Sequence, residues 1–255
     1  MATKETWPKV GLIWPDVHVP VEDKAAVLAA LRYGQDLKPD IWGQLGDFMS
    51  LDCVSNKRSL RETEGKRISK DFDAGNRLLD NIETAMPGAE KFIIQGNHDA
   101  RMERYLDEHP ELEGSLEVEN ALHLEERGIE WVPFWTTGKI KTIGKANFIH
   151  GLYCNKYHAE KHVTHYGVNI FYGHVHGRQS YTVIRYGDNH AIVGESLGCL
   201  CRLDQGYMRG RPSNWQHAIA TFWWWPNGNF DYAVTNIFGG KFISPQGEVY
   251  DGNKS

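Results

Sequence analysis

The chain has 255 residues, of which 41% are hydrophobic, enough to bury a full core in one large domain. The net charge of −5 excludes a general attraction to nucleic acid or to an anionic membrane, and no apolar run approaches the roughly 18 residues of a membrane span. The many aromatic residues and the lack of low-complexity tracts exclude disorder. We therefore expect one globular domain over residues 1–255, soluble and cytoplasmic.

In the first half of the chain, to about residue 128, apolar runs alternate with amphipathic stretches. Residues 9–14, 40–45 and 91–94 predict buried strands, and residues 22–37 and 66–86 predict helices. The order β-α-β-α-β implies parallel strands joined by right-handed crossovers. Ligands of open α/β sheets collect at the carboxyl ends of such strands, so the residues after each run are the first candidates for a site.

Each of these three strands is followed by residues that can bind a metal ion. After the first strand comes Asp16-Val17-His18, in which the two polar side chains point the same way and can reach one ion. After the second comes Gly46-Asp47, whose glycine allows close approach and whose carboxylate can bridge two cations. After the third comes Gly96-Asn97-His98-Asp99. Each motif alone is equally open to interpretation as a turn or a helix cap.

The second half is expected to be β-rich after helices at residues 100–106 and 110–127, with mixed or antiparallel pairing. The expected strands cover residues 129–134, 139–143, 146–149, 168–172, 180–186, 191–194, 217–225, 230–237 and 241–243. His150-Gly151 and Gly173-His174-Val175-His176 follow two of these runs. His158 and His162 share an expected helix at residues 157–166, but without the glutamate of a His-Glu-x-x-His motif they favour a surface pair.

The four cysteines are too few and too irregularly spaced for a disulfide framework, so we expect Cys53, Cys154, Cys199 and Cys201 to be reduced. Cys199 and Cys201 lie in a stretch, residues 193–203, that is typical of buried strand and turn. Because they also lack the two-residue spacer of a zinc knuckle, core positions are favoured over metal binding.

Oxygen and imidazole donors thus follow five apolar runs, which suggests one site for two metal ions. In the order Asp-x-His, Gly-Asp, Gly-Asn-His-Asp, His-Gly and Gly-His-x-His, the motifs resemble those of the calcineurin-like metallophosphoesterases over residues 10 to about 177. Residues 16–20 and 97–101 are similar to small members encoded by bacteriophages. The resemblance implies an α/β fold of two packed mixed sheets flanked by helices, a four-layer αββα sandwich with its site at the strand ends.

The resemblance also implies a role for each motif residue. One metal ion would be held by Asp16, His18, Asp47 and His176, and the other by Asp47, Asn97, His150 and His174. The two ions would share a hydroxide that attacks phosphorus, and His98, oriented by Asp99, would give a proton to the leaving group. Mixed nitrogen and oxygen ligands point to Mn, Fe, Zn, Ni or Co rather than Mg, with Mn the first candidate for activity.

The segment after Gly46-Asp47 bears on the substrate, which the resemblance implies is a phosphate ester. It continues as Phe48-Met49 and lacks the Asp-Arg-Gly by which the phosphoprotein phosphatases of the superfamily clamp phosphate. A protein phosphatase is therefore disfavoured. The basic stretch from Lys57 to Lys70, together with Arg202, Arg209 and Arg211, allows a polyanion such as nucleic acid or a nucleotide, although a solvated surface is the default interpretation.

We therefore expect a phosphodiesterase, and two alternatives stay open: a phosphomonoesterase and a non-catalytic binding scaffold. The candidate substrate contacts are Arg101, Lys57, Arg58 and Arg61. The similarity to bacteriophage members implies that the enzyme, with nuclease activity as one option, acts in the cytoplasm of an infected host cell. No membrane partner is expected.

Overall fold

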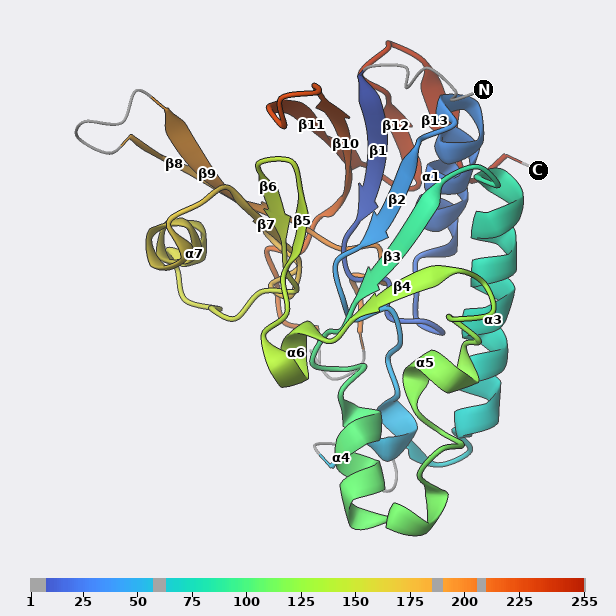
Figure 1. Ribbon diagram of the computed structural model, residues 1–255. Coiled ribbons are helices and arrows are strands. Elements are labelled where there is room, and N and C mark those ends of the chain that lie inside the picture. The colour runs from blue at the N-terminus through green and yellow to red at the C-terminus, as the bar shows by residue number, and fades with distance from the viewer. Residues whose placement is uncertain (1–7, 57–62, 185–189, 206–209, 255) are drawn as a thin grey trace, which may run out of the picture.

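The computed structural model describes residues 8–56, 63–184, 190–205 and 210–254. Two sheets pack face to face and helices cover the outer face of each, so the layers run helix, sheet, sheet, helix (Figure 1). This is the αββα arrangement that the resemblance implied. Within the described residues, no helix is long and apolar enough to cross a membrane.

The first sheet has the strand order β11-β10-β1-β2-β3-β4. Its strands are β1 (Lys9–Trp14), β2 (Ile41–Gln44), β3 (Glu90–Ile94), β4 (Ile129–Val132), β10 (His217–Trp224) and β11 (Phe230–Ile237). Strands β1 to β4 are parallel, as the β-α-β-α-β order predicts, and β10 adds to β1 in the antiparallel sense. The carboxyl ends of β1, β2 and β3 therefore lie at one edge.

The second sheet has the order β5-β6-β7-β9-β8. Its strands are β5 (Lys141–Ile143), β6 (Ala146–Phe148), β7 (Ile170–Tyr172), β8 (Arg178–Ile184) and β9 (Ala191–Leu197). Strands β6, β7 and β9 are parallel, whereas β5 and β8 run antiparallel to their neighbours, so the mixed pairing is confirmed. A separate hairpin joins β12 (Lys241–Ile243) to β13 (Val249–Asp251), a strand that the sequence pattern did not predict.

The helices divide between the two outer faces. Helices α1 (Lys24–Leu37) and α3 (Ile68–Ala85) cover the first sheet, and α7 (His158–Tyr166) covers the second (Figure 1). Alternation along β1 explains the two cores: Leu12 and Trp14 face the helices, and Ile13 packs between the sheets. The inter-sheet core includes Phe92 of the first sheet and Phe148 of the second. This packing fixes the two sheets' strand ends side by side.

Short helices fill the connections near the strand ends. They are η1 (Asp52–Val54), α4 (Arg101–Glu108), η2 (Pro110–Leu112), α5 (Val118–Ala121) and α6 (Phe134–Thr137). The long helix expected at residues 110–127 is therefore wrong. Gly114 has a φ of +87°, which interrupts the helical turn begun at Pro110. Between Gly114 and residue 127 the structure has a single short helix, α5.

The expected surface pair on α7 is also wrong. His158 and His162 are 7% and 0% exposed because they face the second sheet. The ring of His162 stacks on Tyr172 with centroids 3.9 Å apart, and His158 Nδ1 lies 2.7 Å from the Tyr172 hydroxyl. His162 Nε2 accepts a hydrogen bond from the backbone N–H of Leu152. Burial of these rings is therefore matched by specific polar contacts.

Candidate metal centre

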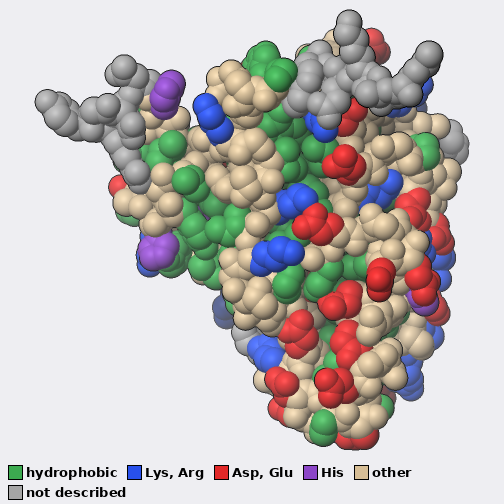
Figure 2. Space-filling view, viewed as in Figure 1, with side chains coloured by type: hydrophobic (Ala, Val, Ile, Leu, Met, Phe, Trp, Pro, Cys, Tyr) green, Lys and Arg blue, Asp and Glu red, His purple; other side chains and the backbone are tan. Residues whose placement is uncertain are grey.

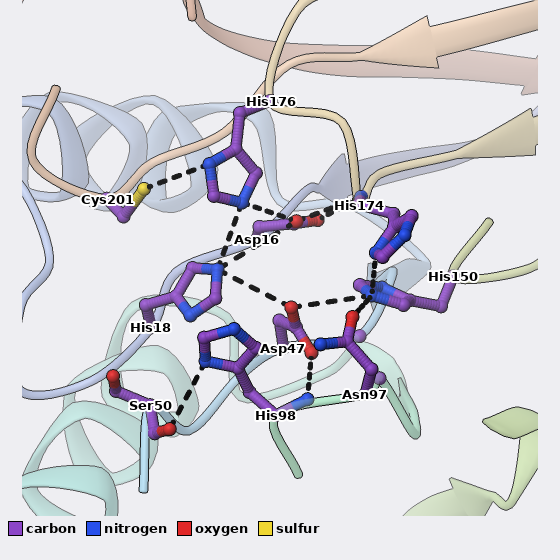
Figure 3. Close-up of polar contacts among 12 residues, drawn as sticks. Asp16, His18, Asp47, Ser50, Asn97, His98, His150, His174, His176 and Cys201 are labelled. Carbon is purple, nitrogen blue, oxygen red and sulfur yellow. Dashed lines mark hydrogen bonds and ion pairs between the residues drawn. The ribbon is translucent and has the colours of Figure 1, made fainter. Parts of the chain in front are cut away.

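The carboxyl ends of strands from both sheets meet at one place, and the predicted ligands lie there (Figure 3). The first sheet brings Asp16 and His18 after β1, Asp47 after β2 and Asn97 after β3. The second sheet brings His150 after β6, and His174 and His176 after β7. The structure thus brings together every side chain that the motifs nominate as a ligand.

Asp16, His18, Asp47 and His176 form the first group, all buried and with ligand atoms within 4.8 Å of one another. His176 Nε2 lies 2.9 Å from Asp16 Oδ2 and 3.0 Å from His18 Nε2. His18 Nε2 lies 3.5 Å from Asp47 Oδ2. Two carboxylates and two imidazoles therefore converge on one point.

Asp47, His150 and His174 form a second group by the same criterion. His150 Nε2 lies 3.4 Å from Asp47 Oδ2 and 3.1 Å from His174 Nδ1. The side-chain oxygen of Asn97 adds a further donor, 3.0 Å from His150 Nε2. Asp47 belongs to both groups, which is the position that a carboxylate bridging two cations needs.

The donor chemistry of both groups fits divalent cations. His150 Nδ1 lies 2.9 Å from the carbonyl oxygen of Leu45, which can only accept, so Nδ1 carries a proton and Nε2 is the nitrogen that a cation would bind in place of its proton. In the neutral imidazoles of His18 and His176, facing Nε2 lone pairs 3.0 Å apart repel each other unless a cation or a proton is shared. Mixed imidazole and carboxylate sets of this kind suit transition metals.

Burial and mutual contact shift the titration of these groups. Burial lowers the pKa of His18 well below its ordinary value and lowers the pKa of His174 to about 4. Burial opposes ionisation of Asp47, but the surrounding imidazoles, His150 first, hold its pKa well below the usual range. Burial likewise opposes the charge of His150, whose pKa Asp47 raises to about 9. The central carboxylate is therefore ionised at neutral pH, as a cation ligand must be.

Two motif glycines make room for the carboxylates. A Cβ placed on Gly96 would lie 2.1 Å from Asp47 Oδ1, and one on Gly173 would lie 1.9 Å from Asp16 Oδ1. Real Cβ atoms do not approach other atoms so closely, so each glycine permits a carboxylate from the neighbouring strand end to enter. This explains physically why Gly precedes the polar residues in two of the motifs.

Four candidate ligands adopt left-handed backbone conformations. The φ values of His18, Asp47, His174 and His176 are +55°, +53°, +66° and +62°. Such values are uncommon for residues with a Cβ and cluster at functional sites, because the surrounding structure must hold them. The strand ends turn sharply at these residues and so direct their side chains into the shared space.

Comparison with known proteins gives related phage proteins and a set of distant structures. No protein-family model matches the chain. The Gene 54 protein of Mycobacterium phage L5 is 25% identical over 218 residues, which cover 80% of this chain and 85% of that protein. Vacuolar protein sorting 29 from Cryptosporidium parvum has 12% identity and a TM-score of 0.47, covering 96% of this chain and 97% of its own. A single mutant of Vps29 from Entamoeba histolytica has 11% identity and a TM-score of 0.44, covering 95% and 98%.

The αββα layers and the meeting of the five motifs around Asp47 are the arrangement that the sequence resemblance implied. The chain has a mixed α/β fold of two packed sheets flanked by helices, which agrees with the resemblance to the calcineurin-like metallophosphoesterases. The phage relative fits the similarity of residues 16–20 and 97–101 to phage-encoded members. Within this fold, a buried cluster of His and Asp suggests a dimetal phosphoesterase.

His98 lies beside the candidate ligands, with its ring 4.4 Å from that of His18. The structure corrects the expectation that Asp99 orients it. Asp99 accepts hydrogen bonds from the backbone N–H groups of Met49 and Gly96, both at 2.8 Å, and so holds two strand-end loops together. Among the described residues, the ring nitrogens of His98 instead contact Ser50 and Arg101.

The contacts of His98 define its tautomer. Nδ1 lies 3.2 Å from the carbonyl oxygen of Ser50 and must donate, while Nε2 lies 3.0 Å from Arg101 Nη2 and must accept. Arg101 is held in turn by Asp52, with Nη1 2.8 Å from Oδ1. Burial lowers the pKa of His98 to about 4; Asp47 raises it and Arg101 lowers it further. The ring is therefore a neutral imidazole fixed by a buried arginine.

The basic residues proposed as substrate contacts fall into two sets. Lys57, Arg58 and Arg61 lie outside the described residues, so their role stays a prediction. Arg101 is only 8% exposed and contacts Asp52, Ser50 and His98, so its role in substrate binding also stays a prediction. Lys66, also in the basic stretch, pairs with Asp52 at 2.8 Å.

The surface charge near α4 is acidic. Figure 2 shows Asp and Glu side chains gathered over the end of the molecule that α4 and α5 form in Figure 1. The exposed residues there include Asp107, Glu108, Glu111, Glu113 and Glu119. On this face, the acidic end would repel a polyanionic substrate.

Sequence reasoning missed three residues beside the ligands. Cys201 follows β9 and places its sulfur 3.8 Å from His176 Nδ1. Cys199 and Cys201 are buried, as predicted, but the predicted strand ended too early to show that β9 also delivers residues to the site. Trp135 and Trp215 contact ligand rings and had no motif to reveal them, because their proximity arises only from packing.

Proposed function

We propose that the protein is a metal-dependent phosphoesterase whose site holds two divalent cations. Asp16, His18, Asp47 and His176 would bind one, and Asp47, Asn97, His150 and His174 the other. The observation that carries the proposal is the membership of Asp47 in both ligand groups. Mn, Fe, Zn, Ni and Co suit these donors, and Mn is the first to test. When bound, such a pair supplies positive charge to the phosphoryl oxygens and activates water.

The remaining roles in the proposed reaction fall to residues beside the ligands. His98 is not a member of either ligand group, and its ring lies against His18, at the border of the cluster. It is the candidate proton donor to the leaving group, in the protonated form that the negative charge of a bound phosphate ester would favour. Because Arg101 occupies its Nε2 and Ser50 accepts from its Nδ1, His98 must exchange one of these contacts for the substrate. Arg101 and Asp52 are therefore positioning residues for the imidazole.

A phosphodiester suits the site better than a phosphomonoester. A diester phosphate carries one negative charge, whereas a monoester carries close to two at neutral pH and calls for an additional cationic clamp. Among the residues that the structure describes, Arg101 and Lys66 are both paired with Asp52 and are not presented as such a clamp. We therefore favour phosphodiesters of nucleotides or nucleic acid, hydrolysed inside the phage-infected cell.

Hydrolysis assays with defined metal content test the proposal. Protein stripped with chelator and reloaded with Mn should hydrolyse bis-p-nitrophenyl phosphate, and should do so with higher kcat/KM than p-nitrophenyl phosphate. Metal analysis should give two ions per chain. Faster hydrolysis of the monoester would favour the phosphomonoesterase alternative, and failure of every candidate metal to support either reaction would overturn the enzymatic proposal.

A further inference from the structure

Two tryptophans border the ligand cluster at different ligands. Trp135, on α6, has its ring 5.8 Å from His150 and 5.5 Å from His174. Trp215, which precedes β10, has its ring 4.2 Å from His176, inclined by 70°. Trp135 is 37% exposed and Trp215 is half-buried, so neither ring is enclosed by the core. Each half of the candidate metal centre therefore has an indole at its border.

Trp215 also lines a pocket of about 410 Å³. The pocket therefore adjoins the metal centre through the same side chain that contacts His176. Leu203 and Phe238, 39% and 75% exposed, give it apolar walls, and Gln216 and Asn236 bring side-chain amides. Apolar walls with a few polar groups are typical of sites that bind a flat heterocyclic ligand.

The charge of this pocket selects against phosphate. Among its described lining residues the only formally charged side chains are Asp23 and Asp204, and there is no Lys or Arg. Asp204 is paired with Arg202 at 2.9 Å, and Asp23 caps α1 by accepting from the N–H of Ala26. A phosphate group would be repelled there, whereas an uncharged aromatic ring that can form hydrogen bonds would be accepted.

We propose that Trp215 and Trp135 stack the two nucleobases that flank a scissile phosphodiester, the base on the Trp215 side entering the adjoining pocket. The proposal rests on the proposed phosphodiesterase function and names its substrate class. With the phosphate at the metal centre, a nucleoside extends from it in each direction, and an indole borders the cluster at His176 and another at His150 and His174. Every nucleobase presents a π face, so such stacking tolerates many sequences.

The test compares a dinucleoside monophosphate with its abasic counterpart, which keeps the sugars, the charge and the leaving group but lacks both bases. Stacking is worth roughly five- to 150-fold per base, so the wild-type protein should favour the base-bearing substrate in kcat/KM by about tenfold or more. Trp215→Ala and Trp135→Ala should each lose much of that preference, because each should slow hydrolysis of the base-bearing substrate more than hydrolysis of the abasic one. Trp215→Phe, which retains an aromatic face, should keep most of it.

Trp225→Ala is the matched control, since Trp225 is 46% exposed and lies beyond the end of β10 opposite to His217. It should leave the preference unchanged. Circular dichroism and metal content identify any variant that fails to fold, and Trp215→Phe then provides the comparison. Equal rates on the two substrates in wild type, or equal losses on both in the Trp135 and Trp215 variants, would overturn the inference.

A binding measurement separates this inference from the proposed function. Quenching of tryptophan fluorescence on rapid mixing reports binding of the two ligands before turnover. Tighter binding of the base-bearing ligand that depends on Trp215 supports the stacking site even if no hydrolysis is found. Hydrolysis of bis-p-nitrophenyl phosphate without any base-dependent binding supports the phosphoesterase and overturns the stacking site.

Discussion

The two sheets contribute different chemistry to the site. Strand ends of the first sheet supply the oxygen donors Asp16, Asp47 and Asn97, with His18 the one imidazole. Strand ends of the second sheet supply the imidazoles of His150, His174 and His176 and no carboxylate to either ligand group. Neither sheet alone carries a complete group. The centre is therefore a product of how the sheets pack, which a motif within one sheet cannot specify.

Specific hydrogen bonds cross the seam, the boundary where the strand ends of the two sheets meet. His150 of the second sheet donates to the carbonyl oxygen of Leu45 in the first, and the backbone N–H of Leu200, after β9, donates to the carbonyl oxygen of Asp16 at 2.7 Å. The backbone N–H of His174 donates to the Asp16 carboxylate. These hydrogen bonds therefore orient the strand ends of the second sheet, which carry the imidazoles, relative to the carboxylates of the first sheet without any bound cation.

The most damaging break should be Asp47→Asn. The variant keeps the shape of the side chain but removes the charge shared by both ligand groups, so both ions should bind weakly and turnover should fall below detection. Metal content by mass spectrometry and the rate on bis-p-nitrophenyl phosphate check this. Full metal content together with wild-type activity would contradict the two-metal assignment.

The next effect concerns His98, which belongs to neither ligand group. His98→Asn should retain its metals and lose about 10² to 10⁴ in kcat on nucleoside esters, whose leaving group needs a proton. It should lose far less on p-nitrophenyl esters, whose leaving group hardly needs one. The measurement is kcat on both ester types beside metal content. Loss of metal, or equal slowing on both esters, would assign the imidazole to another role.

A smaller effect is expected from crowding the seam. Gly173→Ala should force its Cβ against Asp16 Oδ1, lowering the unfolding free energy by about 1–3 kcal/mol and weakening metal binding. Urea denaturation and metal titration check both effects. Gly88→Ala is the control, because no heavy atom lies within 4 Å of its Cβ position and its φ is not positive. Equal stability of the two variants would show that the seam can relax.

The smallest effect concerns Cys201, whose sulfur contacts Nδ1 of His176, one of the imidazoles that the second sheet supplies. Cys201→Ala removes the contact at Nδ1 and should weaken binding of the ion held by His176 by about tenfold, leaving the other ion and kcat at saturating metal unchanged. Stepwise metal titration checks this. Cys154→Ala, at an exposed position, should change nothing. An equal weakening of both ions would mean that Cys201 supports the whole centre instead of one imidazole.

Most of the fold was predictable because its signals are local. The strand at Lys9–Trp14 was predicted at its observed bounds, and the alternating first half gave the parallel order correctly. The ligand candidates were also local, since each motif sits just after an apolar run. The division of the ligands into two groups that share Asp47 agrees with the resemblance. The spacing of the motifs along the chain alone could not have predicted it.

The features that sequence reasoning missed depend on contacts between distant residues. Asp99 reads as a partner for its neighbour His98, yet its oxygens accept from Met49 and Gly96 instead. His158 and His162 read as exposed until the second sheet covers them. Trp215 approaches His176 only because β10 joins the far side of the first sheet. No periodicity within a window of the chain carries this information.

The left-handed backbone at four ligand positions has a consequence for mutational scanning. An alanine at Asp47, His174 or His176 would add a backbone penalty of about 1–2 kcal/mol to the loss of the donor, because Cβ then crowds the carbonyl oxygen without a polar side chain to compensate. Asparagine tolerates this conformation and glycine adopts it freely. Asparagine replacements therefore report ligand loss most directly, and alanine or valine replacements at these positions would exaggerate each residue's share in catalysis.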